Sequence, residues 1–208
     1  MSNVHWFMST VTIVLALTIV TGILLALYGV MIYNRLIALR NRFKNSFAQI
    51  DVQLKRRHDL LPNLIATAKG YMQHEQQTLE RVVQARNQAS DSLKAAASDP
   101  TNPEAIAQLS QAETKLAGAV GQFKVLIEAY PVLKASENMQ QLSEELISTE
   151  NRISFARQAY NDQVMEYNIY RESFPQNIFA AHFGHKQAAQ LLELGERDQL
   201  DQVPTAQF

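Results

Sequence analysis

The sequence predicts an all-α protein, in which a single N-terminal transmembrane helix is continuous with a long antiparallel, up-and-down helical bundle. The first 34 residues contain no Lys, Arg, Asp or Glu. Apolar residues recur every three or four positions through most of the remaining chain, which is the period of one helix face. Only seven Gly and six Pro occur among 208 residues, so turns are few and helices must be long.

The apolar run from Val11 to Ile32 is typical of a membrane span. As a helix it would be roughly 33 Å long, which is about the thickness of the hydrocarbon core of a bilayer. The chain lacks the basic start, short apolar stretch and small-residue cleavage site of a secretory signal peptide. We therefore predict a short external N-terminus over residues 1–10 and a transmembrane helix over residues 11–33.

The residues on either side of the span predict its orientation. No Lys or Arg precedes the span and several follow it, so the positive-inside rule places the N-terminus outside and the body in the cytoplasm. Aromatic side chains mark both edges, as expected at the headgroups of a lipid bilayer. The membrane-interface candidates are Trp6, Tyr28, Tyr33, Arg35, Arg40, Arg42 and Lys44. Topology alone explains the four cations, without specific lipid binding.

Small residues repeat every four positions within the span, at Thr18, Gly22 and Ala26. This spacing places them on one stripe, where a second helix can approach closely. The stripe predicts a homo-oligomer. The alternative is that small residues are simply common in membrane spans.

Four helical segments are predicted within a cytoplasmic bundle over residues 34–174. The first three cover residues 34–61, 62–89 and 103–130, and the fourth covers residues 136–174. Each of the first three would be roughly 42 Å long, and matched lengths favour antiparallel packing. No Gly or Pro separates the span from the first segment, so the membrane helix should continue into the bundle as a rigid stem.

The connection between the first two segments, Arg57 to Pro62, contains no Gly. Its proline suits the first turn of a new helix, which would make a four-helix bundle. The same proline is compatible with a kinked, continuous first helix, which would make a three-helix bundle. The sequence leaves both arrangements open.

Composition argues against several classes of function. A net charge of −1 argues against a nucleic-acid partner, and the absence of Cys excludes thiol chemistry. His74-Glu75 begins like a zinc-protease helix, but Thr78 stands where the second His is required. His182 and His185 are spaced for a shared metal, but they lack a further ligand nearby. We therefore expect no enzymatic activity, no metal and no cofactor.

Several longer motifs, in the same order along the chain, resemble the LemA family. The matching motifs cover residues 49–64, 69–75, 80–86, 130–138, 141–162 and 173–178. The resemblance extends from about Tyr33 to Gly184. It implies a single-span protein of the bacterial inner membrane, with its N-terminus outside, a cytoplasmic helical bundle and no established enzymatic activity.

Two of these motifs supply candidates for binding an unknown protein partner. They are Lys55, Arg56, Arg57, His58 and Asp59 in the first and Tyr130, Lys134, Glu137 and Asn138 in the second. In an up-and-down bundle both would lie at the tip farthest from the membrane, as one composite surface. The competing interpretation of the first set is structural, since cations suit the last turn of a helix and Asp59 could cap the next one.

Residues 175–208 are predicted to form a partly apolar, flexible tail. Its cluster of Phe and Ile side chains would lie in the membrane interface or pack back on the bundle. The last residues, from Val203, are expected to be flexible or to dock as a peptide. The leading hypothesis for function is a non-enzymatic, membrane-anchored scaffold or adaptor. The alternatives are a membrane organiser that oligomerises and contacts lipid through its tail, or a regulator of a membrane protease or envelope quality control.

Overall fold

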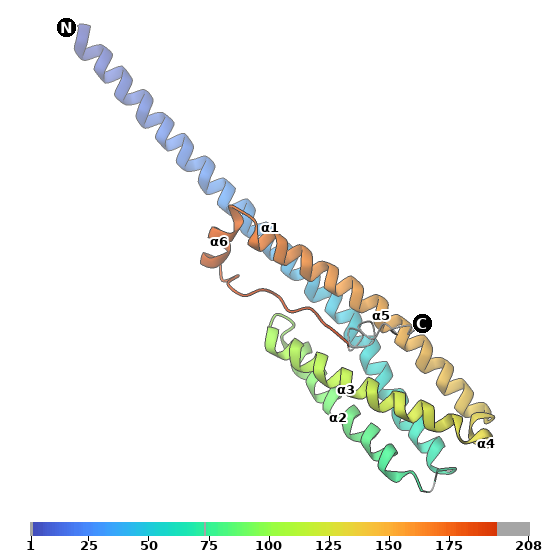
Figure 1. Ribbon diagram of the computed structural model, residues 1–208. Helices are drawn as coiled ribbons and strands as arrows, with labels where there is room; N and C mark the ends of the chain where they lie inside the picture. The colour runs from blue at the N-terminus through green and yellow to red at the C-terminus, as the bar shows by residue number, and fades with distance from the viewer. Residues whose placement is uncertain (1, 73, 195–208) are drawn as a thin grey trace, which may run out of the picture.

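A computed structural model describes residues 2–72 and 74–194. Within these ranges the chain forms helices and no strand (Figure 1). The helices are α1 (Ser2–Lys69), α2 (Gln76–Ser98), α3 (Pro103–Glu128), α4 (Pro131–Lys134), α5 (Glu137–Glu172) and α6 (Gln176–His182). The predicted all-α fold is confirmed.

Helix α1 is a single helix of 68 residues that serves two purposes. Its N-terminal part extends out of the bundle as an isolated rod (Figure 1), and its large apolar side chains from Val11 to Met31 are exposed. This part is long and apolar enough to cross a membrane. From Ile32 onward one face is buried in the bundle, and the predicted continuity of rod and bundle is thereby confirmed.

The chain does not reverse at Arg57 to Pro62, so the predicted boundary between the first two bundle helices is wrong. Pro62 lies inside α1, which ends at Lys69, and the reversal follows Gly70. The buried stripe of α1 continues through Leu61, Leu64 and Ala68. The first residues of the predicted 62–89 helix therefore belong to α1, which is continuous. The described part of the bundle nevertheless contains four long helices, α1, α2, α3 and α5, as predicted, and not the three of the continuous-helix alternative.

Helix α5 returns along α1 and forms the most extensive helix pair of the bundle. Helices α2 and α3 form a hairpin, which packs on α1 through α2 (Figure 1). Short α4 turns the chain at the end of the bundle farthest from the rod. We call this end the distal tip.

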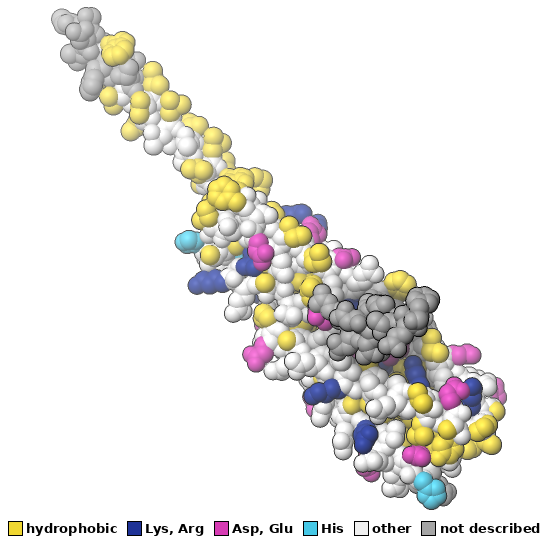
Figure 2. Space-filling model, in the orientation of Figure 1, with side chains coloured by type: hydrophobic (Ala, Val, Ile, Leu, Met, Phe, Trp, Pro, Cys, Tyr) yellow, Lys and Arg dark blue, Asp and Glu magenta, His cyan; other side chains and the backbone are white. Residues whose placement is uncertain are grey.

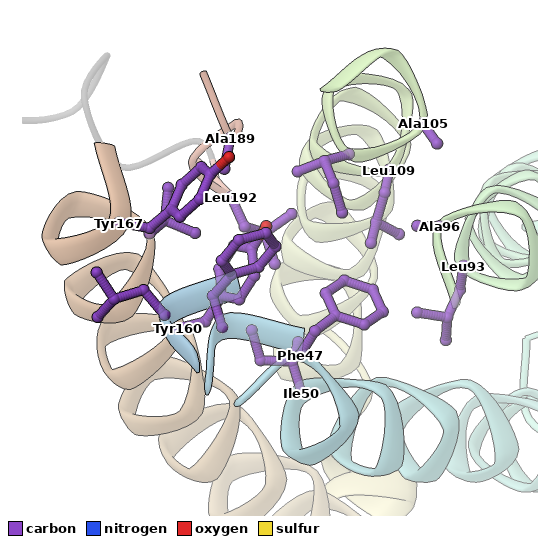
Figure 3. Packing of buried hydrophobic residues seen from close by; sticks show 14 of the residues in the cluster. Phe47, Ile50, Leu93, Ala96, Ala105, Leu109, Tyr160, Tyr167, Ala189 and Leu192 are labelled. Carbon is purple, nitrogen blue, oxygen red and sulfur yellow. The ribbon is translucent and has the colours of Figure 1, made fainter. Parts of the chain in front are cut away.

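Two hydrophobic clusters fill the bundle. The proximal cluster lies toward the rod and includes Phe43, Phe47 and Tyr160, whose rings meet edge to face. Figure 3 shows Phe47, Tyr160 and Leu109 pointing into this cluster from α1, α5 and α3. The distal cluster includes residues of α1, α2, α3, α4 and α5.

The described part of the predicted tail packs on the bundle. Helix α6 lies beside α1, and residues 183–194 follow α5 back toward the distal tip (Figure 1). Ala189 and Leu192 are buried in the proximal cluster. Of the two placements left open for the tail, its described residues 175–194 show packing back on the bundle, and the predictions for the residues from Val203 lie outside the described residues.

Candidate functional site

A layer of buried polar side chains separates the two hydrophobic clusters. Arg57 and His58 interrupt the apolar stripe of α1, and Glu113 interrupts that of α3. Glu150 on α5 completes the set, which we call the polar layer. The side chain of Glu113 is 0% exposed, and those of Arg57 and His58 are each 3% exposed.

Charge pairing holds this layer together. The Nη2 atom of Arg57 donates to Glu113, and Nη1 donates to both carboxylate oxygens of Glu150 at 3.1 Å. Burial, with the neighbouring Arg57 and Arg86 guanidinium groups, lowers the pKa of His58 to about 3. Neutral His58 can donate through Nε2 to Glu113, 2.9 Å away.

Pro62 creates a further polar contact beside this layer. In a regular helix the N–H of residue 62 would donate to the carbonyl of His58, and proline has no N–H. Instead, Nε of Arg86 on α2 donates to that carbonyl at 3.0 Å. Pro62 thus couples α1 to α2 through Arg86.

The predicted position of Lys55 to Asp59 at the distal tip is therefore wrong. These residues lie within α1, more than two turns before its end, and buried Arg57 and His58 face the interior. The exposed members make local or interhelical ion pairs, Lys55 with Asp51, Arg56 with Glu145 and Asp59 with Arg86. They do not form one surface with the second motif.

The second motif does lie at the distal tip. Tyr130 precedes α4, Lys134 ends it, and Glu137 and Asn138 begin α5. Lys134 pairs with Glu128, and both side chains remain more than half exposed. Val132 on α4 is 72% exposed.

Some of the membrane-interface candidates form contacts within the bundle. Glu166 on α5 pairs with Arg35 at 2.9 Å and with Arg42 at 3.6 Å. Arg40 donates to Thr101 in the α2–α3 connection at 3.2 Å. Tyr33 meets the ring of Phe183 edge to face.

The remaining interface and stripe candidates, apart from Lys44, lie on the exposed rod. Trp6 is 74% exposed and Tyr28 is 36% exposed, while Lys44 is exposed just inside the bundle. Thr18, Gly22 and Ala26 are exposed, and a Cβ added at Gly22 would meet no atom within 4 Å. Both the membrane contacts and self-association through this stripe stay predictions.

Sequence reasoning missed an extended segment held by α5. Asn168 bonds both the N–H and the carbonyl of Ala189, each at 2.9 Å. Asn161 does the same for Leu192, at 2.9 and 3.1 Å. Arg157 adds a bond to the carbonyl of Leu194 at 3.4 Å. Their spacing of seven and then four residues on one helix was the available signal.

A groove between α3 and α5 continues beyond Leu194. It has a volume of about 820 Å³. Its walls include Gly118, Gly121 and Val125 of α3 and Ser154 of α5, and the polar layer contributes Arg57, Glu113 and Glu150. Among the described residues, no three His, Asp or Glu side chains are grouped closely enough to hold a metal ion.

These features define a class of helical protein. One long helix provides an apolar segment outside the bundle and then a helix of the bundle itself, and the interior of the bundle contains a layer of charged side chains. The LemA family model matches residues 46–208. The chain therefore belongs to the LemA family. A comparison with curated proteins finds no match.

Proposed function

We propose that this chain is a non-enzymatic scaffold or adaptor, anchored in the inner membrane with its N-terminus outside and its bundle in the cytoplasm. The observation that carries the proposal is the unbroken course of α1 from Ser2 to Lys69. A helix without a hinge fixes the orientation of the bundle to the membrane. From Tyr33 to Lys69 it spans roughly 54 Å.

The distal tip is the partner-binding surface in this proposal. Its exposed side chains combine an apolar group, Val132, with charged and polar groups at Lys134, Glu137 and Asn138. At that height the surface lies far beyond the Debye length of about 8 Å, so lipid charge would not reach it. A protein partner fits this position better than a lipid does.

Photocrosslinking in intact cells tests this role. A photoreactive amino acid at Val132 should give a discrete crosslinked product with a cytoplasmic or membrane protein. The same probe at Lys94, exposed on α2 nearer the rod, is the matched control and should not give that product. Identical products from both positions, or none from Val132, would contradict the tip as the binding surface. Crosslinks to extracytoplasmic proteins would contradict the orientation.

The position of α6 favours a second candidate, a membrane organiser that contacts lipid. A Cβ added at Gly29, within the predicted span, would lie 3.4 Å from the ring of Phe179. Phe174 is 79% exposed and Ile178 is 53% exposed. Figure 2 shows hydrophobic side chains gathered where the rod joins the bundle. If the rod spans a bilayer, this cluster lies at the height of the cytoplasmic headgroups.

Tryptophan quenching by brominated lipids tests this contact. The chain has one Trp, so Trp6→Phe combined with Phe174→Trp gives a single probe at α6. We expect its fluorescence to fall by at least half in vesicles of brominated lipid. The matched control is Phe155→Trp in the same background, because Phe155 is 74% exposed on α5, roughly 28 Å farther along the bundle. Equal quenching at both positions, or none at 174, would reject the lipid contact.

A further inference from the structure

We propose that a pocket in the part of the bundle nearer the rod binds a phosphate group, either free phosphate or the headgroup of an anionic lipid. The pocket has a volume of about 510 Å³, within the roughly 300–1,000 Å³ typical of small-ligand sites. It lies where α1, α5, the α2–α3 connection and the chain after α6 meet (Figure 1). Phosphate binding there does not depend on the adaptor role.

Two cations without a carboxylate partner line the pocket. Arg40 extends from α1, and Lys186 extends from the chain after α6. Neither forms an ion pair within the described part of the chain, whereas Arg35 and Arg42, on the same stretch of α1, both pair with Glu166. An unpaired guanidinium and an unpaired ammonium in one pocket favour an anionic ligand with several oxygens, such as phosphate.

Among the described residues that line the pocket, Asp99 is the only carboxylate. Its Oδ1 atom accepts from the N–H of Thr101 at 3.0 Å and from the hydroxyl of Thr101 at 2.6 Å. These hydrogen bonds, and to a lesser extent the charges of Lys44 and Arg40, lower the pKa of Asp99. Its negative charge is thus already engaged within the turn, and the cations around it leave the pocket with a net positive charge.

The N-terminus of α3 adds to this positive potential. Thr101, Asn102 and Pro103 line the pocket, and α3 begins at Pro103. The aligned peptide dipoles of a helix place about half a positive charge at its start. The side chain of Asn102 already bonds the N–H groups of Glu104 and Ala105. The dipole, rather than free N–H groups, therefore acts on a bound anion.

A buried histidine contributes an atom without a partner. His185 lines the pocket and is 3% exposed, and its Nε2 atom makes no hydrogen bond. Burial, with the nearby Arg40 and Arg171 guanidinium groups, lowers the pKa of His185. The ring is therefore neutral near pH 7 and carries a single proton.

Tyr167 determines which ring nitrogen carries that proton. Its hydroxyl lies 2.9 Å from Nδ1 of His185. Burial raises the pKa of Tyr167, so the hydroxyl keeps its hydrogen and can donate it to Nδ1. The ring proton is then on Nε2, which becomes an unpaired buried donor. Such a donor is costly, and a phosphate oxygen would satisfy it.

The pocket also lies at a height that lipid headgroups reach. Arg40 follows Tyr33, the last residue of the predicted span, by roughly 10 Å along α1. If the rod spans a bilayer, as the proposed function requires, the headgroup layer takes up about 5–8 Å of this distance. The remaining gap is shorter than the Debye length of about 8 Å, so anionic lipid is attracted to the pocket. Free phosphate reaches the same pocket from solution.

Calorimetric titration of the full chain in neutral detergent, at fixed pH and ionic strength, tests the proposal and compares the two sources. The probes are inorganic phosphate and dihexanoyl phosphatidic acid, a short-chain lipid with a phosphomonoester. Dihexanoyl phosphatidylcholine, whose quaternary ammonium offsets the phosphate charge, is the control and should not bind. Binding of phosphatidic acid at least about tenfold tighter than that of phosphate would assign the pocket to lipid, and a smaller difference would assign it to free phosphate.

Charge-removing variants test the pocket itself. Arg40→Gln should weaken binding of both phosphate probes at least about fivefold, because it removes the guanidinium. Lys186→Gln, at an exposed position, is an independent repeat that leaves the interior intact. Arg42→Gln removes the same charge from the same stretch of α1, beside Glu166, and should change the affinity less than about twofold. Helical circular dichroism reports whether each variant folds.

Histidine ring signals locate the bound phosphate. In protein labelled with ¹⁵N in its histidines, the Nε2 signal of His185 should shift when inorganic phosphate is added. His58 is also buried, but it lies in the polar layer. Its ring signals are the control within the same sample and should not move.

Three results would overturn the proposal. The first is that neither phosphate probe binds, or that phosphatidylcholine binds as tightly as phosphatidic acid. The second is an equal loss of affinity in Arg40→Gln and Arg42→Gln, which would show attraction by surface charge alone. The third is an unmoved His185 signal while phosphate is bound, which would place the anion elsewhere. None of these measurements depends on orientation in a membrane, so the adaptor role stands or falls separately.

Discussion

Glu113→Leu is expected to lower the free energy of unfolding by about 3–5 kcal/mol, because it leaves Arg57 charged and only partly paired in the interior. Glu113 accepts from Arg57 and lies within hydrogen-bonding distance of His58, and its own side chain is 0% exposed. Glu150, which is 35% exposed, would remain as the only counter-ion of Arg57 among the described residues. Thermal and chemical unfolding followed by circular dichroism measure the loss.

The matched control for this prediction is Glu145→Leu. Glu145 pairs with Arg56, next in the chain to Arg57, but both side chains of that pair are more than 40% exposed. Its loss should cost about 0–1 kcal/mol. An equal cost for Glu113→Leu and Glu145→Leu would contradict a dry polar layer.

Replacing Arg57, His58 and Glu113 together distinguishes the cost of an unpaired buried charge from the cost of fitting a leucine side chain into the layer. The triple variant Arg57→Met, His58→Leu, Glu113→Leu removes all three buried polar groups and should recover most of the stability that Glu113→Leu loses. If the triple variant is no more stable than Glu113→Leu, the cost arises from the shape of leucine rather than from unpaired charge.

The periodicity of apolar residues predicted the helical fold and the continuity of rod and bundle, because those features follow from local pattern. It misplaced the first reversal for a definite reason. Arg57 and His58 occupy core positions of α1 and interrupt its apolar stripe, and Pro62 follows them. In the sequence this pattern is the same as that of one helix that ends and another that begins, although α1 is continuous. Only the acceptors on α3 and α5 show that these polar residues belong inside.

The candidate site was less accessible to sequence reasoning. Glu113 stands in register with Leu109 and Leu116, so it was a visible charge at a core position, but the sequence does not identify its partner. The two asparagines that hold Ala189 and Leu192 bond main chain, and main-chain groups carry no sequence signal. The sequence analysis predicted that Lys55 to Asp59 lie at a tip because it assumed that a cluster of charged residues marks an exposed turn.

Arg86→Met is expected to lower the free energy of unfolding by about 1–3 kcal/mol, because it leaves the carbonyl of buried His58 without a donor. The cause lies one turn farther along α1, where Pro62 lacks the N–H that would otherwise satisfy this carbonyl. The Arg86–Asp59 pair contributes little, since its atoms are 3.8 Å apart and Asp59 is 78% exposed. Asn87→Ala, which removes only a surface contact of Arg86, is the control.

A double-mutant cycle with Pro62→Ala tests this cause directly. Alanine at position 62 restores an N–H that donates to the His58 carbonyl within α1. In the Pro62→Ala background, Arg86→Met should therefore cost at least about 1 kcal/mol less than it does beside proline. Strictly additive effects would show that Arg86 stabilises the bundle by another contact. Coupling of the expected sign would mean that the proline of the first LemA-like motif and the arginine of the third together join the α2–α3 hairpin to the long helix.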